Sequence, residues 1–295
     1  MSGSTAHETQ RRPARVPTHD ELPPLIPRPA LAIIDEAITF LRVDPGLLFG
    51  VTLIVLLPLR VISAAMPGSQ LRDARPDELM DVVVGNASSF GTDFAPFATL
   101  ILESIALFSV ASIFAHVATI WYAGQPATLT DVLVVSVKRS PLLALGWIFV
   151  HVLEVIGALF TLGLGGIVLA VFVTLTAPIM GAEKVGPIRA IRRSFNLMSG
   201  TWFHGAIVFV CAGLGALVMR LAIETAPSVI GLELLQLPLW AVAGVADIIA
   251  SIVVTALVAA VSTVHYLDAR VRREGIDLDM AATRAFDESR RGRSR

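Results

Sequence analysis

The sequence predicts an all-α integral membrane protein that crosses the bilayer six times. Its 295 residues are 55% hydrophobic and 16% charged, whereas soluble domains average about 25% charged residues. The mean hydropathy is +0.73. A spanning helix needs about 20 mostly apolar residues, and runs of this kind occur at residues 47–66, 96–120, 141–160, 163–180, 202–222 and 238–264.

Three segments follow from this pattern. Residues 1–29 are rich in proline and arginine and lack the apolar core of a signal peptide, so we expect a disordered cytoplasmic tail. Residues 30–266 form the six-span membrane domain, and residues 267–295 form a charged cytoplasmic tail. The third and fourth spans are separated only by Thr161, Leu162 and a glycine cluster, which predicts a tight helical hairpin at the membrane surface.

Amphipathic helix patterns precede the first and fifth spans. The spacing i, i+3, i+7, i+10 is shared by two sets of apolar residues, Leu31, Ile34, Ile38 and Leu41, and Ile188, Ile191, Phe195 and Met198. Each pattern ends in helix-breaking residues. A looser counterpart at 129–139 ends at Ser140-Pro141, before the third span. The sequence thus favours three repeats of an interfacial helix followed by a transmembrane hairpin, although the middle copy is imperfect.

The basic residues predict the orientation, because short cytoplasmic loops carry an excess of Lys and Arg. With the N-terminus inside, the cytoplasmic side holds Arg11, Arg12, Arg15, Arg28, Arg42, Lys138, Arg139, Lys184, Arg189, Arg192, Arg193 and the arginines from Arg270 onward. The opposite side holds only Arg60, Arg72, Arg75 and Arg220. We therefore expect a multi-pass protein of the cell inner (plasma) membrane with both termini in the cytoplasm.

Three arginines, Arg189, Arg192 and Arg193, lie largely off the apolar stripe of the second amphipathic helix. This is the arrangement of a helix that lies in the headgroup plane. One interpretation is contact with anionic lipid. The other is simple topological anchoring, which the positive-inside bias alone explains. The lipid bilayer is in either case the expected partner.

Charged residues within the spans require an explanation, because they are costly in hydrocarbon. The expected topology places a polar set at similar depth in the outer half of the bilayer: Arg60, Glu103, His151, Glu154, Arg220 and Asp247. These residues either form ion pairs that hold helices together or line an outward-opening polar cavity. In the second case His151 and Glu154, which share a helix face, would exchange protons or bind a cation.

Several function classes are disfavoured. The one cysteine, Cys211, rules out an intramolecular disulfide and a multi-thiolate metal site. Phosphate-loop, zinc-protease and hydrolase-elbow motifs are missing from the sequence. We expect no catalytic residues, no metal, no cofactor and no binding of nucleic acid, and therefore a protein that is not an enzyme.

Two segments carry a resemblance to a known family. They are Gly186-Pro-Ile-Arg-Ala-Ile-Arg-Arg-Ser-Phe-Asn-Leu-Met-Ser-Gly-Thr-Trp202 and Tyr266-Leu-Asp-Ala-Arg-Val-Arg-Arg-Glu-Gly-Ile-Asp-Leu-Asp279. In these the chain resembles the bacterial membrane family labelled the membrane domain of glycerophosphoryl diester phosphodiesterase, and related membrane families of undefined role. The resemblance implies a multi-span membrane module without the soluble catalytic domain, and it implies no catalytic residue.

The leading functional hypothesis is a non-catalytic scaffold or accessory partner of another membrane protein in the cell envelope. The alternative is a small transporter or lipid carrier that uses the intramembrane polar set. A carrier should have a water-filled cavity between its spans, whereas a scaffold should have paired charges and a closed core.

Overall fold

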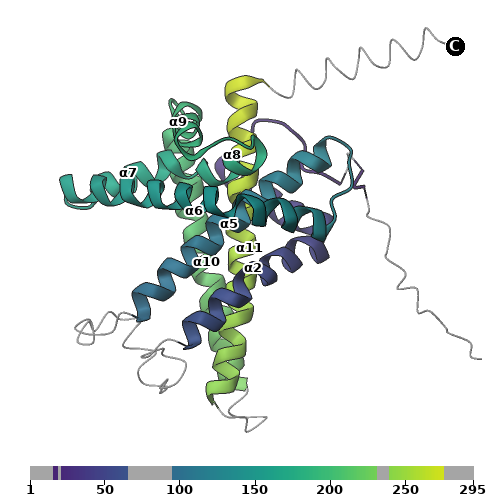
Figure 1. The fold of residues 1–295 in the computed structure, drawn as a ribbon, viewed down its shortest axis with the longest axis vertical. Coiled ribbons are helices and arrows are strands. Elements are labelled where there is room, and N and C mark those ends of the chain that lie inside the picture. Colours follow the sequence, from purple (N-terminus) through teal and green to yellow (C-terminus); the bar gives the residue numbers. More distant parts are fainter. Residues whose placement is uncertain (1–15, 19–20, 66–94, 231–238, 276–295) are drawn as a thin grey trace, which may run out of the picture.

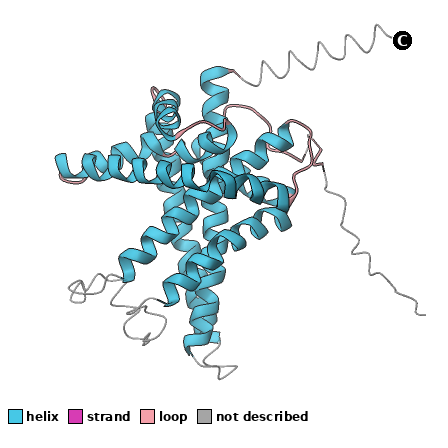
Figure 2. Ribbon diagram, viewed as in Figure 1, coloured by secondary structure: helices cyan, strands magenta, loops and turns pink. Residues whose placement is uncertain are grey.

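The computed structural model describes residues 16–18, 21–65, 95–230 and 239–275, and every regular element in them is an α-helix (Figures 1 and 2). In chain order the helices are α1 (Ala30–Val43), α2 (Pro45–Ala65), α5 (Ala95–Tyr122), α6 (Leu129–Phe160), α7 (Leu164–Val173), α8 (Thr176–Ala182), α9 (Pro187–Met198), α10 (Trp202–Ile230) and α11 (Leu239–Glu274).

The predicted all-α class with six membrane-spanning segments is confirmed. Six segments of the described chain are long and apolar enough to cross a membrane: Pro45–Ile62, Ala98–Tyr122, Leu129–Phe160, Leu164–Ala182, Trp202–Thr225 and Gly244–Glu274. The α10 segment is the most exposed, with apolar side chains such as Phe203, Leu214 and Val218 on its surface. Exposed apolar surface of this extent suits contact with lipid rather than water.

The fourth span is interrupted between α7 and α8. Pro178 has no backbone N–H to donate to the carbonyl of Thr174, four residues earlier. The hydroxyl of Ser262 on α11 donates to this carbonyl at 3.4 Å. The break is therefore stabilised by a neighbouring helix, as unpaired backbone groups within a membrane require.

The middle amphipathic helix is not a separate element, so its predicted boundary at Ser140-Pro141 is wrong. The helix α6 continues through Pro141 to Phe160. Pro141 leaves the carbonyl of Val137 without its usual donor, and the hydroxyl of Ser140 donates to that carbonyl at 2.8 Å. The first and third amphipathic helices do exist as α1 and α9, and the threefold repeat stays a prediction.

The helix α11 runs along the long axis of the molecule and packs against α10, α5, α1 and α2 (Figure 1). The hairpin of α6 and α7 instead runs across this axis, with its tip away from the bundle (Figure 1). At the tip, Phe160 is 84% and Leu162 is 100% exposed. This placement separates the polar residues of α6 from those of the bundle.

The predicted apolar stripes only partly match the buried faces. On α1 the buried residues include Ile33, Ala37 and Phe40, whereas Leu31 and Ile38 of the predicted stripe are exposed. On α9, Ile188 is likewise exposed. Because these helices pack on the bundle as well as facing outward, they carry apolar residues on more than one face.

The predicted disordered tail at 1–29 is wrong for residues 21–29. Leu22 and Arg28 are buried, and the Tyr122 hydroxyl donates to the carbonyl of Pro23 at 2.5 Å. The backbone N–H of Arg28 donates to Asp268 Oδ1 at 2.8 Å. Residues 1–15 and 19–20 lie outside the described part. At the other end α11 continues beyond the predicted boundary at 266 to Glu274, and residues 276–295 lie outside it.

Candidate functional site

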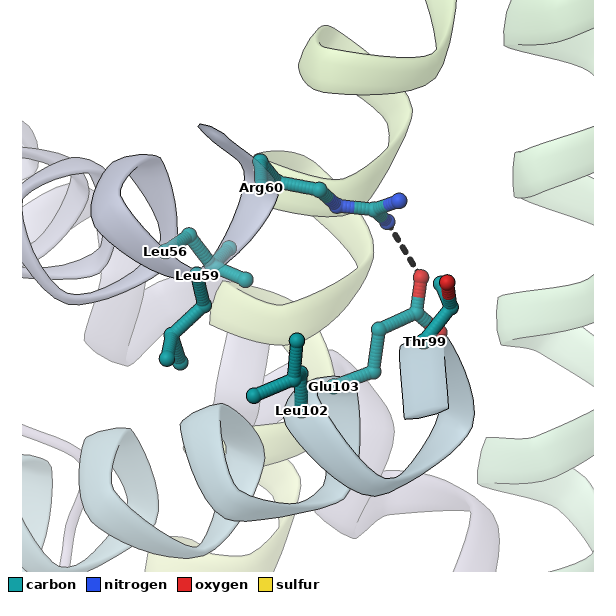
Figure 3. A pocket seen from close by; sticks show the side chains of 6 residues that line it. All are labelled: Leu56, Leu59, Arg60, Thr99, Leu102 and Glu103. Atoms are coloured by element: carbon teal, nitrogen blue, oxygen red, sulfur yellow. Dashed lines mark hydrogen bonds and ion pairs between the residues drawn. The ribbon is translucent and has the colours of Figure 1, made fainter. Parts of the chain in front are cut away.

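Arg60 on α2 is the centre of an ion-pair cluster within the helix bundle. Its guanidinium donates to Glu103 on α5, to Asp247 Oδ2 on α11 at 3.1 Å, and to the hydroxyl of Ser251 one turn further along α11. Figure 3 shows Arg60 and Glu103 pointing toward each other. The Arg60 side chain is only 10% exposed, so these partners, rather than water, stabilise its positive charge.

Arg220 on α10 contacts the same carboxylates. It donates to Asp247 Oδ1 at 3.0 Å and to Glu103 at 3.4 Å. It also donates to Glu224, one turn further along its own helix, at 2.7 Å. We call Arg60, Glu103, Arg220, Glu224 and Asp247 the bundle ion cluster. Its members come from four helices, and Glu103 and Asp247 are each shared by two arginines.

The bundle ion cluster contains four of the six predicted intramembrane residues. Sequence reasoning missed Glu224, although its spacing of four residues from Arg220 is a recognised ion-pair signal. The other two predicted members, His151 and Glu154, lie apart from it on α6. Their side chains pair only loosely, with 4.0 Å between His151 Nε2 and Glu154 Oε2, and His151 Nδ1 lies 3.0 Å from the carbonyl of Trp147. The prediction of one cluster shared by all six is therefore wrong, because the α6–α7 hairpin leaves the bundle.

The surface beside the bundle ion cluster has a shallow depression with an empty volume of about 170 Å³. It is lined by Leu56, Leu59, Arg60, Thr99, Leu102 and Glu103 (Figure 3). It encloses no space that would hold a water molecule. Arg60 and Glu103 are paired with each other at the edge of this depression.

The three arginines of α9 have different environments. Arg189 and Arg192 are exposed, as contact with lipid headgroups requires. Arg193 instead donates to both carboxylate oxygens of Glu183, at 3.0 and 3.2 Å, and pairs with Glu274 on α11. Burial by itself lowers the pKa of Arg193, but the hydrogen bonds and charges of Glu183 and Glu274 outweigh it and raise the pKa above its ordinary value.

These contacts fix α9 against the bundle. The Tyr266 hydroxyl donates to Glu183 at 3.1 Å, and the rings of Phe195 and Phe172 stack with centroids 4.9 Å apart. The Ser194 hydroxyl donates to the carbonyl of Phe172 at 2.6 Å. Arg193 is therefore an intramolecular contact, and of the three predicted lipid contacts Arg189 and Arg192 are the available ones.

A second polar group escaped the sequence analysis: His204 at the start of α10, with His265 and Asp268 near the end of α11. One potential ligand atom from each lies within 4.8 Å of the others. His265 is 3% and Asp268 0% exposed, and neither ring nitrogen of His265 has a hydrogen-bond partner among the described residues. Leaving a buried polar group unpaired costs about 1–3 kcal/mol. The available signal was the His-x-x-Asp spacing of His265 and Asp268, which begins one residue before the segment that starts at Tyr266.

Comparison with protein-family models, curated proteins and solved structures finds no match for this chain. The resemblance described from the sequence therefore stays a prediction.

Proposed function

We propose that this chain is a non-catalytic scaffold or accessory partner of another membrane protein in the plasma membrane, with both termini in the cytoplasm. The observation that carries the proposal is the pairing of Arg60 and Arg220 with Glu103 and Asp247 across four helices. Paired charges suit a bundle that holds one arrangement. A carrier would need some of them to face a hydrated path.

The exposed face of α9 supports the same proposal. Arg193, Ser194 and Phe195 hold this helix to α8, α7 and α11, which leaves Arg189 and Arg192 on the exposed side. A helix held in this way presents its basic side chains in a defined position, to anionic headgroups or to an acidic partner.

The first test identifies what the exposed face contacts. A photo-crosslinking amino acid is placed at Arg192, and as a control at Leu217, an exposed apolar position on α10. The full chain is then purified gently from its own membrane and analysed by mass spectrometry. A scaffold predicts one protein, in stoichiometric amount, linked from position 192 and not from 217. A retained lipid or solute without any protein partner would favour the carrier alternative instead.

A second test asks whether water reaches the bundle ion cluster. Cys211 is the one cysteine of the chain, so Cys211→Ser gives a background for single-cysteine labelling. Ser251, which accepts from Arg60 and is 3% exposed, is changed to cysteine in this background. We expect Ser251→Cys to resist a membrane-impermeant maleimide in sealed vesicles of either orientation. Rapid labelling would reveal a water path and contradict the proposal.

A further inference from the structure

The start of α10 and the end of α11 bring together side chains that are typical metal ligands. His204 lies in the first turn of α10, and His265 and Asp268 lie three residues apart on α11, so they share one face of that helix. His204 Nε2 is 3.3 Å from Asp268 Oδ2, and the His204 and His265 ring centroids are 6.0 Å apart. The three side chains converge between two helices that pack against each other.

His265 is the least satisfied polar side chain of the three. It is almost completely buried, and both of its ring nitrogens lack a hydrogen-bond partner in the described chain. The backbone of α10 lies close beside it: a Cβ added to Gly205 would be 3.2 Å from His265 Nε2. An imidazole needs one donor and one acceptor contact, or a metal ion in place of a proton.

Asp268 is held in a fixed orientation by donors from two other segments. The backbone N–H of Arg28 donates to Oδ1 at 2.8 Å, and Arg272 Nε donates to Oδ2 at 2.7 Å. Carboxylates that bind metals are commonly oriented by such outer hydrogen bonds.

We propose that His204, His265 and Asp268 bind one divalent transition-metal ion, most suitably zinc. Two imidazoles and a carboxylate are ligands that zinc accepts, and the same set also suits iron(II). Zinc bonds of about 2.0–2.1 Å place tetrahedral ligand atoms roughly 3.3 Å apart, somewhat closer than the 4.8 Å spread of the group. His204 Nε2 and Asp268 Oδ2 are already 3.3 Å apart, and His204 is the most exposed of the three side chains and so has the most freedom to adjust.

The bound ion would join three segments of the chain. His204 belongs to α10, the other two ligands belong to α11, and Arg28 connects the N-terminal segment to Asp268. The ion would therefore act as a structural clamp at this end of the bundle. This inference differs from the expectation of a metal-free protein and is independent of the proposed function.

The test uses the full chain in detergent, stripped with a chelator and then titrated with Zn²⁺ by calorimetry and with Co²⁺ by visible absorption. We expect one equivalent of each ion, with a Co²⁺ spectrum typical of nitrogen and oxygen ligands. His265→Ala and Asp268→Asn should weaken binding roughly 100-fold or more. The matched control is His116→Ala, which removes another buried histidine, on α5, and should retain the full equivalent.

His265 and Asp268 are buried, so their variants test the fold as well as metal binding. His204→Ala separates the two effects, because His204 is partly exposed. It should weaken binding to a similar degree while the protein remains folded by circular dichroism. A wild-type chain that takes up no stoichiometric Zn²⁺ or Co²⁺ would overturn the proposal. Full binding by folded His204→Ala would also overturn it.

Discussion

Arg60 and Asp247 are 187 residues apart in the chain, yet Arg60 Nη1 lies 3.1 Å from Asp247 Oδ2. This contact joins α2 to α11, and Arg220 joins α10 to the same carboxylate. The two arginines thereby connect the helices that surround α11.

Arg60→Leu should destabilise the fold strongly. The change leaves Glu103 and Asp247 partly unpaired inside the bundle, and breaking a buried pair by removing one partner costs about 3–5 kcal/mol. Thermal unfolding in detergent measures the loss. Arg189→Leu, an arginine change at an exposed position, should leave the unfolding temperature nearly unchanged. Equal stability of the two variants would show that the bundle ion cluster does not hold the helices together.

Glu154→Gln should have little effect on stability. Glu154 Oε2 lies 4.0 Å from His151 Nε2, and the side chains of His151 and Glu154 are 37% and 27% exposed. A long, partly exposed pair of this kind contributes less than about 1 kcal/mol to the free energy of unfolding. A double-mutant cycle with His151→Gln gives the coupling energy directly. A coupling well above about 1 kcal/mol would contradict the expectation of a weak pair.

Arg189→Gln with Arg192→Gln should reduce the amount of anionic lipid that copurifies. Each basic residue near an anionic leaflet contributes about 1 kcal/mol, and both side chains are exposed. The measurement is lipid mass spectrometry, or binding to nanodiscs with and without anionic lipid, repeated at higher salt. Arg193→Gln is the contrast, because it removes ion pairs with Glu183 and Glu274. It should lower stability more than lipid retention, and the reverse pattern would contradict the assignment.

Gly181→Ala should disrupt the contact of α8 with α5. An added Cβ would lie 1.8 Å from the backbone oxygen of Ser112, so one of the two helices must move. Small residues allow this kind of close approach in membranes. Gly213→Ala on α10 is the matched control, because a Cβ there meets nothing within 4 Å. It should be neutral or stabilising, by up to about 1 kcal/mol, through helix propensity. Unfolding in detergent compares the two.

Local properties of the sequence were sufficient to predict the six apolar spans and the two amphipathic helices α1 and α9. An apolar run of about 20 residues is a spanning candidate whatever its neighbours, and the periodicity at 188–198 predicts α9 without knowledge of its partners. The four-residue spacing of Arg220 and Glu224 is a further local signal of an ion pair, although Glu224 was not among the predicted residues. The ends of the helices were harder to predict from the sequence. Pro141 lies inside α6, where the Ser140 hydroxyl donates to the carbonyl that the proline leaves without a donor, and composition alone does not reveal this contact.

Only the tertiary structure decided which polar residues meet. Glu154 was grouped with Glu103 because both were expected at a similar depth, but depth says nothing of direction, and the α6–α7 hairpin extends away from the bundle (Figure 1). Residues 21–29 pack against the bundle because their partners, such as Asp268, come from the far end of the chain. His204 and His265 converge for the same reason. The sequence by itself determined which segments are apolar enough to enter a membrane, whereas contacts between distant residues depend on how the helices pack.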